Sequence, residues 1–135
     1  MLLIRINKNM QQFIKETALS LGFDACGIAR AEALTEDAVF LRSWLDARMH
    51  GEMSYLARNF EKRTDPRELV PGCKSVVTVL LNYCPPVSQP ADAPRIARYA
   101  FSEIDYHTVI KGLLAKLEAA IVENYGSECI NSNVQ

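Results

Sequence analysis

The sequence predicts an α/β fold in which a mixed β-sheet is flanked by helices. Helical periodicity is strongest at residues 10–21, 35–50 and 105–125. Two short apolar segments, 24–29 and 75–83, lie between these helices and are typical of buried strands. The chain has 135 residues, of which 49% are hydrophobic, and this is enough for one core. Helices and strands that follow one another in this way pack as layers around a sheet.

The first elements are marked by recognisable boundary residues. The helix over residues 10–21 is followed by Gly22, which suits a left-handed carboxyl-terminal cap. The strand expected over residues 24–29 comes directly after this turn. The next helix begins at Thr35, and the acidic residues in its first turn would stabilise it by interacting with the helix dipole. At the beginning of the chain, residues 2–6 either form a short strand or lie before a natural initiator methionine at Met10.

A second helical stretch is expected over residues 51–60, where Met53 and Tyr55 are more typical of core than of a cofactor wall. In the segment TDPRELVPG that follows, Asp65 suits a helix cap, Pro66 the first helical position and Glu68 a capping box. Residues 75–83 (SVVTVLLNY) are apolar on both faces. We therefore expect a central strand covered by helices on both sides.

The second half begins with residues 84–95, where four prolines predict an exposed loop. A strand is expected over residues 96–101, and the helix over residues 105–125 should end at Gly126. Residues 129–134 would start another strand. Because the sequence stops there without a terminating signal, we expect a truncated amino-terminal domain.

Composition excludes several classes of protein. A net charge of −1 argues against coating nucleic acid by bulk charge. The four cysteines (Cys26, Cys73, Cys84, Cys129) form no C-x-x-C pair, which argues against a zinc knuckle, a ferredoxin cluster or a redox dithiol within this chain. No apolar run reaches the roughly 20 residues that a membrane span needs, and the first ten residues have no long apolar core of the kind expected in a secretory signal. We expect a cytoplasmic protein with no membrane contact.

The densest group of reactive side chains is Asp105-Tyr106-His107, at a predicted junction between strand and helix. A carboxylate and an imidazole at such an edge favour acid–base chemistry. The alternative is that Asp105 caps the helix by accepting the amide of Thr108. These roles conflict, because capping favours the ionised carboxylate whereas a proton donor needs a raised pKa.

A second candidate is a basic run that acidic residues interrupt. One interpretation is a solvated helix face with internal ion pairs, and the other is contact with phosphate or cofactor amides. Arg95 and Arg98 would extend it across the loop. The run consists of Arg58, Lys62, Arg63, Arg67 and Lys74.

Six motifs in order point to a known family. They are GFDACGIA (22–29), WLDARMHGEMSYLARN (44–59), KRTDPRELVPGCKSVV (62–77), LNYCP (81–85), ARYA (97–100) and DYH (105–107). Together they cover nearly the whole chain, and the chain resembles the amino-terminal region of epoxyqueuosine reductases.

The resemblance implies a cytoplasmic reductase that removes the epoxide oxygen of epoxyqueuosine in the anticodon loop of tRNA. Such enzymes use cobalamin and two four-iron four-sulfur clusters, and take electrons from an external donor. The clusters lie on a following ferredoxin-like domain, bound by C-x-x-C-x-x-C-x-x-x-C-P runs that this chain lacks. Residues 1–135 would thus be the cobalamin-binding domain of a longer reductase, inactive alone.

The resemblance also implies roles for individual residues. Asp105 would be the acid that protonates the leaving oxygen, with Tyr106 and His107 as substrate-binding neighbours. Arg63, Ala97 and Arg98 would border the corrin. Two other readings remain open: a non-enzymatic corrinoid-binding module, and a related corrinoid reductase such as a reductive dehalogenase.

Overall fold

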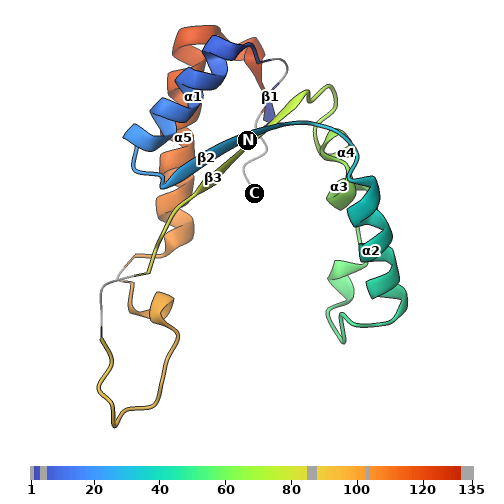
Figure 1. Cartoon of the computed structure of the whole chain (residues 1–135), viewed down its shortest axis with the longest axis vertical. Helices are drawn as coiled ribbons and strands as arrows, with labels where there is room; N and C mark the ends of the chain where they lie inside the picture. The colour runs from blue at the N-terminus through green and yellow to red at the C-terminus, as the bar shows by residue number, and fades with distance from the viewer. Residues whose placement is uncertain (1, 4–5, 85–87, 103, 132–135) are drawn as a thin grey trace.

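The computed structural model describes residues 2–3, 6–84, 88–102 and 104–131, and these form an arch with two limbs (Figure 1). Two long helices, α1 (Lys8–Ser20) and α5 (Tyr106–Tyr125), lie side by side on one limb. The other limb carries α2 (Thr35–Asp46), α3 (Phe60–Thr64) and α4 (Pro66–Leu69). The sheet connects the two limbs.

The sheet has four strands in the order β2-β3-β1-β4. They are β1 (Leu2–Leu3), β2 (Ala25–Arg30), β3 (Ser75–Leu80) and β4 (Ile130–Asn131). The predicted α/β class is confirmed. All pairings among the described strands are antiparallel, so the parallel pairing that a mixed sheet implies is not found among them. The longest pairing joins β2 and β3, from Ala25 opposite Leu80 to Arg30 opposite Ser75.

The core lies between α1, α5 and one face of the sheet. Alternate residues of β3 point to this face, and Val77 is buried there while Thr78 is exposed. Ile14, Leu117 and Ile121 are fully buried. The buried members of this cluster are Met10, Ile14, Ala18, Phe23, Val77, Leu117 and Ile121. The predicted first and last helices are confirmed because their apolar stripes meet each other here.

The opposite face of the sheet is covered only at one end in the part of the chain that is described. Val76 packs there against Val70, which follows α4. Farther along β3, Thr78 is exposed and Leu80 is 62% exposed. Of the two faces of the segment 75–83 that were expected to be covered, the second is therefore covered only near Val76 in the described residues. The apolar character of both faces does not by itself supply a second layer.

Helix ends follow the local chemistry closely. The side chain of Asn7 accepts the amide of Met10 at 2.9 Å, so α1 begins two residues before the range expected from periodicity. Gly22 and Gly126 take positive φ angles of 102° and 88° after α1 and α5, as expected of residues that end helices. Asp65 caps α4 by accepting the amide of Arg67 at 2.9 Å, as predicted.

The helical stretch predicted over residues 51–60 is wrong. A single 3₁₀ turn, Ser54–Leu56, forms there, and α3 starts only at Phe60. Gly51 and Asn59, at the two ends of this segment, take left-handed backbone angles that do not belong to a helix. Met53 and Tyr55 are about half exposed, at 47% and 51%, so neither is a core residue in the described structure.

The strand predicted over residues 96–101 is also wrong. A 3₁₀ helix spans Arg98–Phe101, closed by bonds such as that from the Ala100 amide to the Ala97 carbonyl at 3.0 Å. A strand needs a neighbour for its backbone groups, and no described strand pairs with this segment.

The proline-rich stretch before it is a loop in its described part, as predicted. Gln89 stabilises this loop through two hydrogen bonds with the backbone of Ile96. Of the strand predicted over residues 129–134, Ile130–Asn131 is present and residues 132–134 lie outside the described part. None of the described helices is long and apolar enough to cross a membrane.

Candidate functional site

Asp105 lies at the amino terminus of α5 and is held there by His107. Its Oδ1 atom accepts the backbone amide of His107 at 3.0 Å and lies 2.9 Å from His107 Nδ1. The capping role is therefore confirmed, although the amide that the carboxylate accepts belongs to His107 and not to Thr108, as the sequence had predicted. The Thr108 amide instead donates to the backbone carbonyl of Asp105 at 2.9 Å.

The electrostatics of this junction favour the carboxylate anion. The backbone amide of His107, followed by its side chain, lowers the pKa of Asp105 below its ordinary value, and the positive charge of Lys111 acts in the same direction. The side chains of Asp105 and His107 are both 63% exposed, so desolvation opposes this effect only weakly. In the described structure, Asp105 is an ionised cap.

An aromatic stack connects the junction to the segment that follows β3. The rings of Tyr83 and Tyr106 stack with centroids 4.5 Å apart at an interplanar angle of 13°. The Tyr106 ring also stacks with that of His107, at 4.0 Å and 30°. Sequence analysis did not identify Tyr83 as a site residue; its only signal was its place in the motif LNYCP, directly after a predicted strand.

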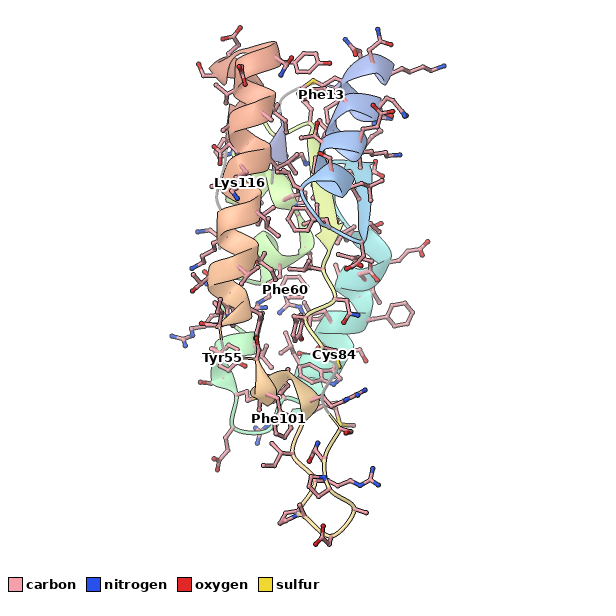
Figure 2. The ribbon with its side chains drawn as sticks, turned by 90° about the vertical axis from the view of Figure 1, so that its left-hand side faces the viewer. Phe13, Tyr55, Phe60, Cys84, Phe101 and Lys116 are labelled. Atoms are coloured by element: carbon pink, nitrogen blue, oxygen red, sulfur yellow. The ribbon has the colours of Figure 1, made fainter. Side chains whose placement is uncertain are left out.

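The segments around this junction gather at one end of the molecule. Cys84 and Phe101 lie toward the same end as the start of α5 (Figure 2), and the loop between β3 and α5 extends from that end in Figure 1. The structure therefore brings Asp105, Tyr106 and His107 together with Tyr83. Three of the four were predicted as site residues.

Arg63 is not brought to this junction. It belongs to α3, on the other limb of the arch (Figure 1). Its guanidinium donates to the backbone carbonyl of Arg58 at 3.3 Å and to that of Tyr55 at 3.4 Å. In the described structure, Arg63 fastens the irregular segment before α3.

Ala97 and Arg98 lie at the start of the 3₁₀ helix on the loop before α5. A pocket of about 520 Å³ adjoins them, lined by Ser88, Gln89, Pro90, Ala91, Arg95, Ile96, Ala97 and Arg98. Every lining residue comes from the loop itself. Arg63 is not among them.

The residues predicted to border the corrin thus do not line one pocket in the described structure. Arg63 lies on one limb, and Ala97 and Arg98 belong to the loop of the other (Figure 1). The pocket beside Ala97 has no contribution from α3.

The basic run is explained in part by ion pairing. The Arg67 guanidinium forms a two-pronged contact with the carboxylate of Asp65, with a shortest distance of 2.6 Å. This contact lowers the pKa of Asp65. The predicted solvated face with internal ion pairs is confirmed for this pair.

Comparison with known proteins agrees with the motifs. Residues 63–134, slightly more than half of the chain, match the family described as Epoxyqueuosine reductase QueG, DUF1730. The chain belongs to the epoxyqueuosine reductase family. No solved structure shows significant similarity to the chain.

Several curated relatives carry the name epoxyqueuosine reductase. One from Cyclobacterium marinum is 47% identical over 117 residues, which cover 85% of this chain and 37% of the relative. One from Vibrio cholerae is 39% identical, covering 84% and 32%, and one from Escherichia coli is 35% identical, covering 92% and 33%. The chain thus spans about a third of the length of the curated epoxyqueuosine reductases that it matches.

Proposed function

We propose that this chain is the amino-terminal part of a reductase that converts epoxyqueuosine to queuosine in the anticodon loop of tRNA. Family membership carries this proposal: residues 63–134 match the family, and relatives named epoxyqueuosine reductase are similar over most of the chain. The longer protein would be cytoplasmic. It would bind cobalamin and two four-iron four-sulfur clusters, and draw electrons from an external donor.

The chemistry defines what the site must supply. Removing an epoxide oxygen as water and leaving a carbon–carbon double bond consumes two electrons and two protons. The four cysteines of this chain include no cluster-binding run, so the electrons would come from parts of the longer protein. The protons need a donor beside the substrate, and we assign this role to Asp105.

The position of Asp105 supports the assignment. Oδ1 is occupied by His107, whereas Oδ2 accepts no hydrogen bond from the described residues and stays open to a ligand. The stacked rings of Tyr83 and Tyr106 beside it offer apolar surface of the kind on which a nucleobase stacks. Tyr106 and His107 would then contact the substrate nucleoside.

The test is turnover of tRNA carrying epoxyqueuosine by the complete protein that contains this chain. Nucleosides released by digestion are quantified by mass spectrometry. Asparagine caps helices as well as aspartate does, so Asp105→Asn should preserve the fold while removing the acid. We expect turnover to fall by about 10²-fold or more, in the range that general acids contribute.

Asp92→Asn, at an exposed position in the loop before α5, is the matched control and should turn over normally. Normal turnover by Asp105→Asn would refute the acid role, and absence of turnover by the unmodified complete protein would refute the proposed reaction. A visible spectrum of the purified complete protein tests for bound cobalamin separately.

The alternative of a non-enzymatic corrinoid-binding module is favoured by one observation, the lack of a cluster motif in these 135 residues. For the chain alone we propose the same outcome, namely no turnover. Adding the chain to substrate with a chemical reductant tests this directly, because any queuosine formed would contradict it.

A further inference from the structure

The hydrogen bond between Asp105 and His107 determines where the proton at this junction lies. An ionised carboxylate only accepts hydrogen bonds, so at 2.9 Å from Asp105 Oδ1 the Nδ1 atom of His107 must carry the hydrogen. Oδ1 also accepts the His107 backbone amide at 3.0 Å, which aligns the two side chains. The imidazole therefore presents Nε2 to its surroundings.

The ring of His107 is fixed by stacking as well as by this bond. Tyr106 stacks with it at 4.0 Å, and Tyr83 stacks with Tyr106 at 4.5 Å. Tyr83 follows β3, so the stack fastens the start of α5 to the strand end. A ring that is held in this way keeps its Nδ1–H directed at the carboxylate.

The charges around the pair make Asp105 a poor acid by itself. The amide and side chain of His107 together with Lys111 lower the pKa of Asp105, and the phenols of Tyr106 and Tyr83 complete the titratable groups stacked beside the pair. A donor of two successive protons must nevertheless hold a proton before each step and regain one after it.

We propose that His107 supplies Asp105 with the protons that Asp105 delivers, an inference that rests on the proposed function. The pair begins as imidazolium and carboxylate. The Nδ1 proton of His107 passes to the carboxylate, and the carboxylic acid gives a proton to the leaving oxygen. The pair then consists of carboxylate and of neutral imidazole, whose remaining hydrogen is on Nε2.

Water returns one proton to the exposed pair, and the imidazolium forms again. The first proton converts the opening epoxide oxygen to a hydroxyl group, and the second releases that hydroxyl group as water. The two electrons come from the reductant of the proposed function, and the pair itself is neither oxidised nor reduced. His107 is in this sense a positioning residue that acts through Asp105.

The substitution His107→Asn separates structure from proton supply. An asparagine amide can donate a hydrogen bond from nearly the place of Nδ1, but it does not transfer a proton near neutral pH. In the complete protein at saturating substrate tRNA, we expect His107→Asn to lose at least tenfold in turnover. Turnover within twofold of the unmodified protein would overturn the proposal.

Chemical rescue gives a readout that a structural role does not affect. In His107→Ala, added imidazole should restore turnover at least fivefold, whereas pyrazole should not. Pyrazole has the same ring shape but is too weak a base to carry the proton. Equal restoration by both compounds, or by neither, would contradict proton supply by His107.

A measurement without turnover keeps this inference distinct from the proposed function. In the imidazolium form, the proton resonance of His107 Nδ1 reports whether this nitrogen donates a hydrogen bond to the carboxylate. We expect this resonance to lie downfield of that of a free imidazolium and to return to the free position in Asp105→Ala. A free position in the unmodified protein would refute the relay even if the complete protein turns over epoxyqueuosine. A downfield position in a protein without turnover would refute only the proposed reaction.

Discussion

Replacing Leu117 by alanine should destabilise the domain strongly, because this residue joins α5 to the rest of the core. Its side chain is fully buried in the cluster that also contains Ile14, Val77 and Ile121. Three carbon atoms are removed, and at about 0.8 kcal/mol each their transfer alone is worth about 2.4 kcal/mol. The cavity left behind raises the expected loss to about 3–4 kcal/mol.

The assay is urea unfolding of the chain, followed by far-ultraviolet circular dichroism. Leu19→Ala is the matched control, since the same carbon atoms are removed from a side chain that is 51% exposed on α1. We expect it to change the free energy of unfolding by less than about 0.5 kcal/mol. Similar losses for the two variants would show that α5 does not pack on α1 and the sheet as described.

The loss of stability in Leu117→Ala should also affect the candidate site, because Asp105 and His107 lie at the first turn of α5. If the helix detaches from the core, the pair loses its alignment with Tyr83. In Leu117→Ala, amide exchange near the start of α5 should therefore accelerate together with that of the helix centre. Acceleration at the centre alone would mean that the aromatic stack holds the helix start independently.

Three further outcomes are expected. Asn7→Ala should lower the free energy of unfolding by about 1 kcal/mol in the same urea assay, because it removes the α1 cap; an unchanged value would contradict the cap. Asp65→Asn should destabilise the chain at neutral pH and progressively less on acidification. The pKa of Asp65 is lowered by Arg67, so its stabilisation is present above about pH 4 and is lost as the carboxylate protonates below that. A pH-independent difference would exclude this ionic origin. Burial raises the pKa of the Cys26 thiol, so Cys26 should be alkylated more slowly at mildly alkaline pH than the exposed Cys84, as measured by peptide mapping; equal rates would show that Cys26 is accessible.

The sparsely covered sheet face shows why a pattern of apolar residues is incomplete evidence. The segment 75–83 is apolar on both sides, yet α1 and α5 cover the side that carries Val77, whereas the other side packs only near Val76, against Val70 after α4. A sequence pattern reports what a strand can bury. Whether a second layer is present depends on segments elsewhere, and the chain spans only about a third of its curated relatives.

Irregular segments were the least predictable part of the fold. The stretch 51–60 has helical spacing, but it lies between the left-handed residues Gly51 and Asn59 and forms only one 3₁₀ turn between them. The stretch 96–101 resembles a strand in composition and forms a 3₁₀ helix, since no described strand lies beside it. In both cases the local sequence preference for helix or strand was weak, and contacts with neighbouring segments determined the backbone conformation.

The first turn of α5, where Asp105 accepts the amide of His107, was readable from the sequence as a capped helix start because the bond joins residues two apart. The Asn7 cap of α1 is equally local, but periodicity alone placed the start of this helix at Met10. The motifs identified the family for a related reason, since they need only order and spacing. Tertiary structure alone placed Tyr83 against Tyr106 and kept Arg63 on the other limb (Figure 1), because such contacts depend on how strands and helices pack across long separations in the chain.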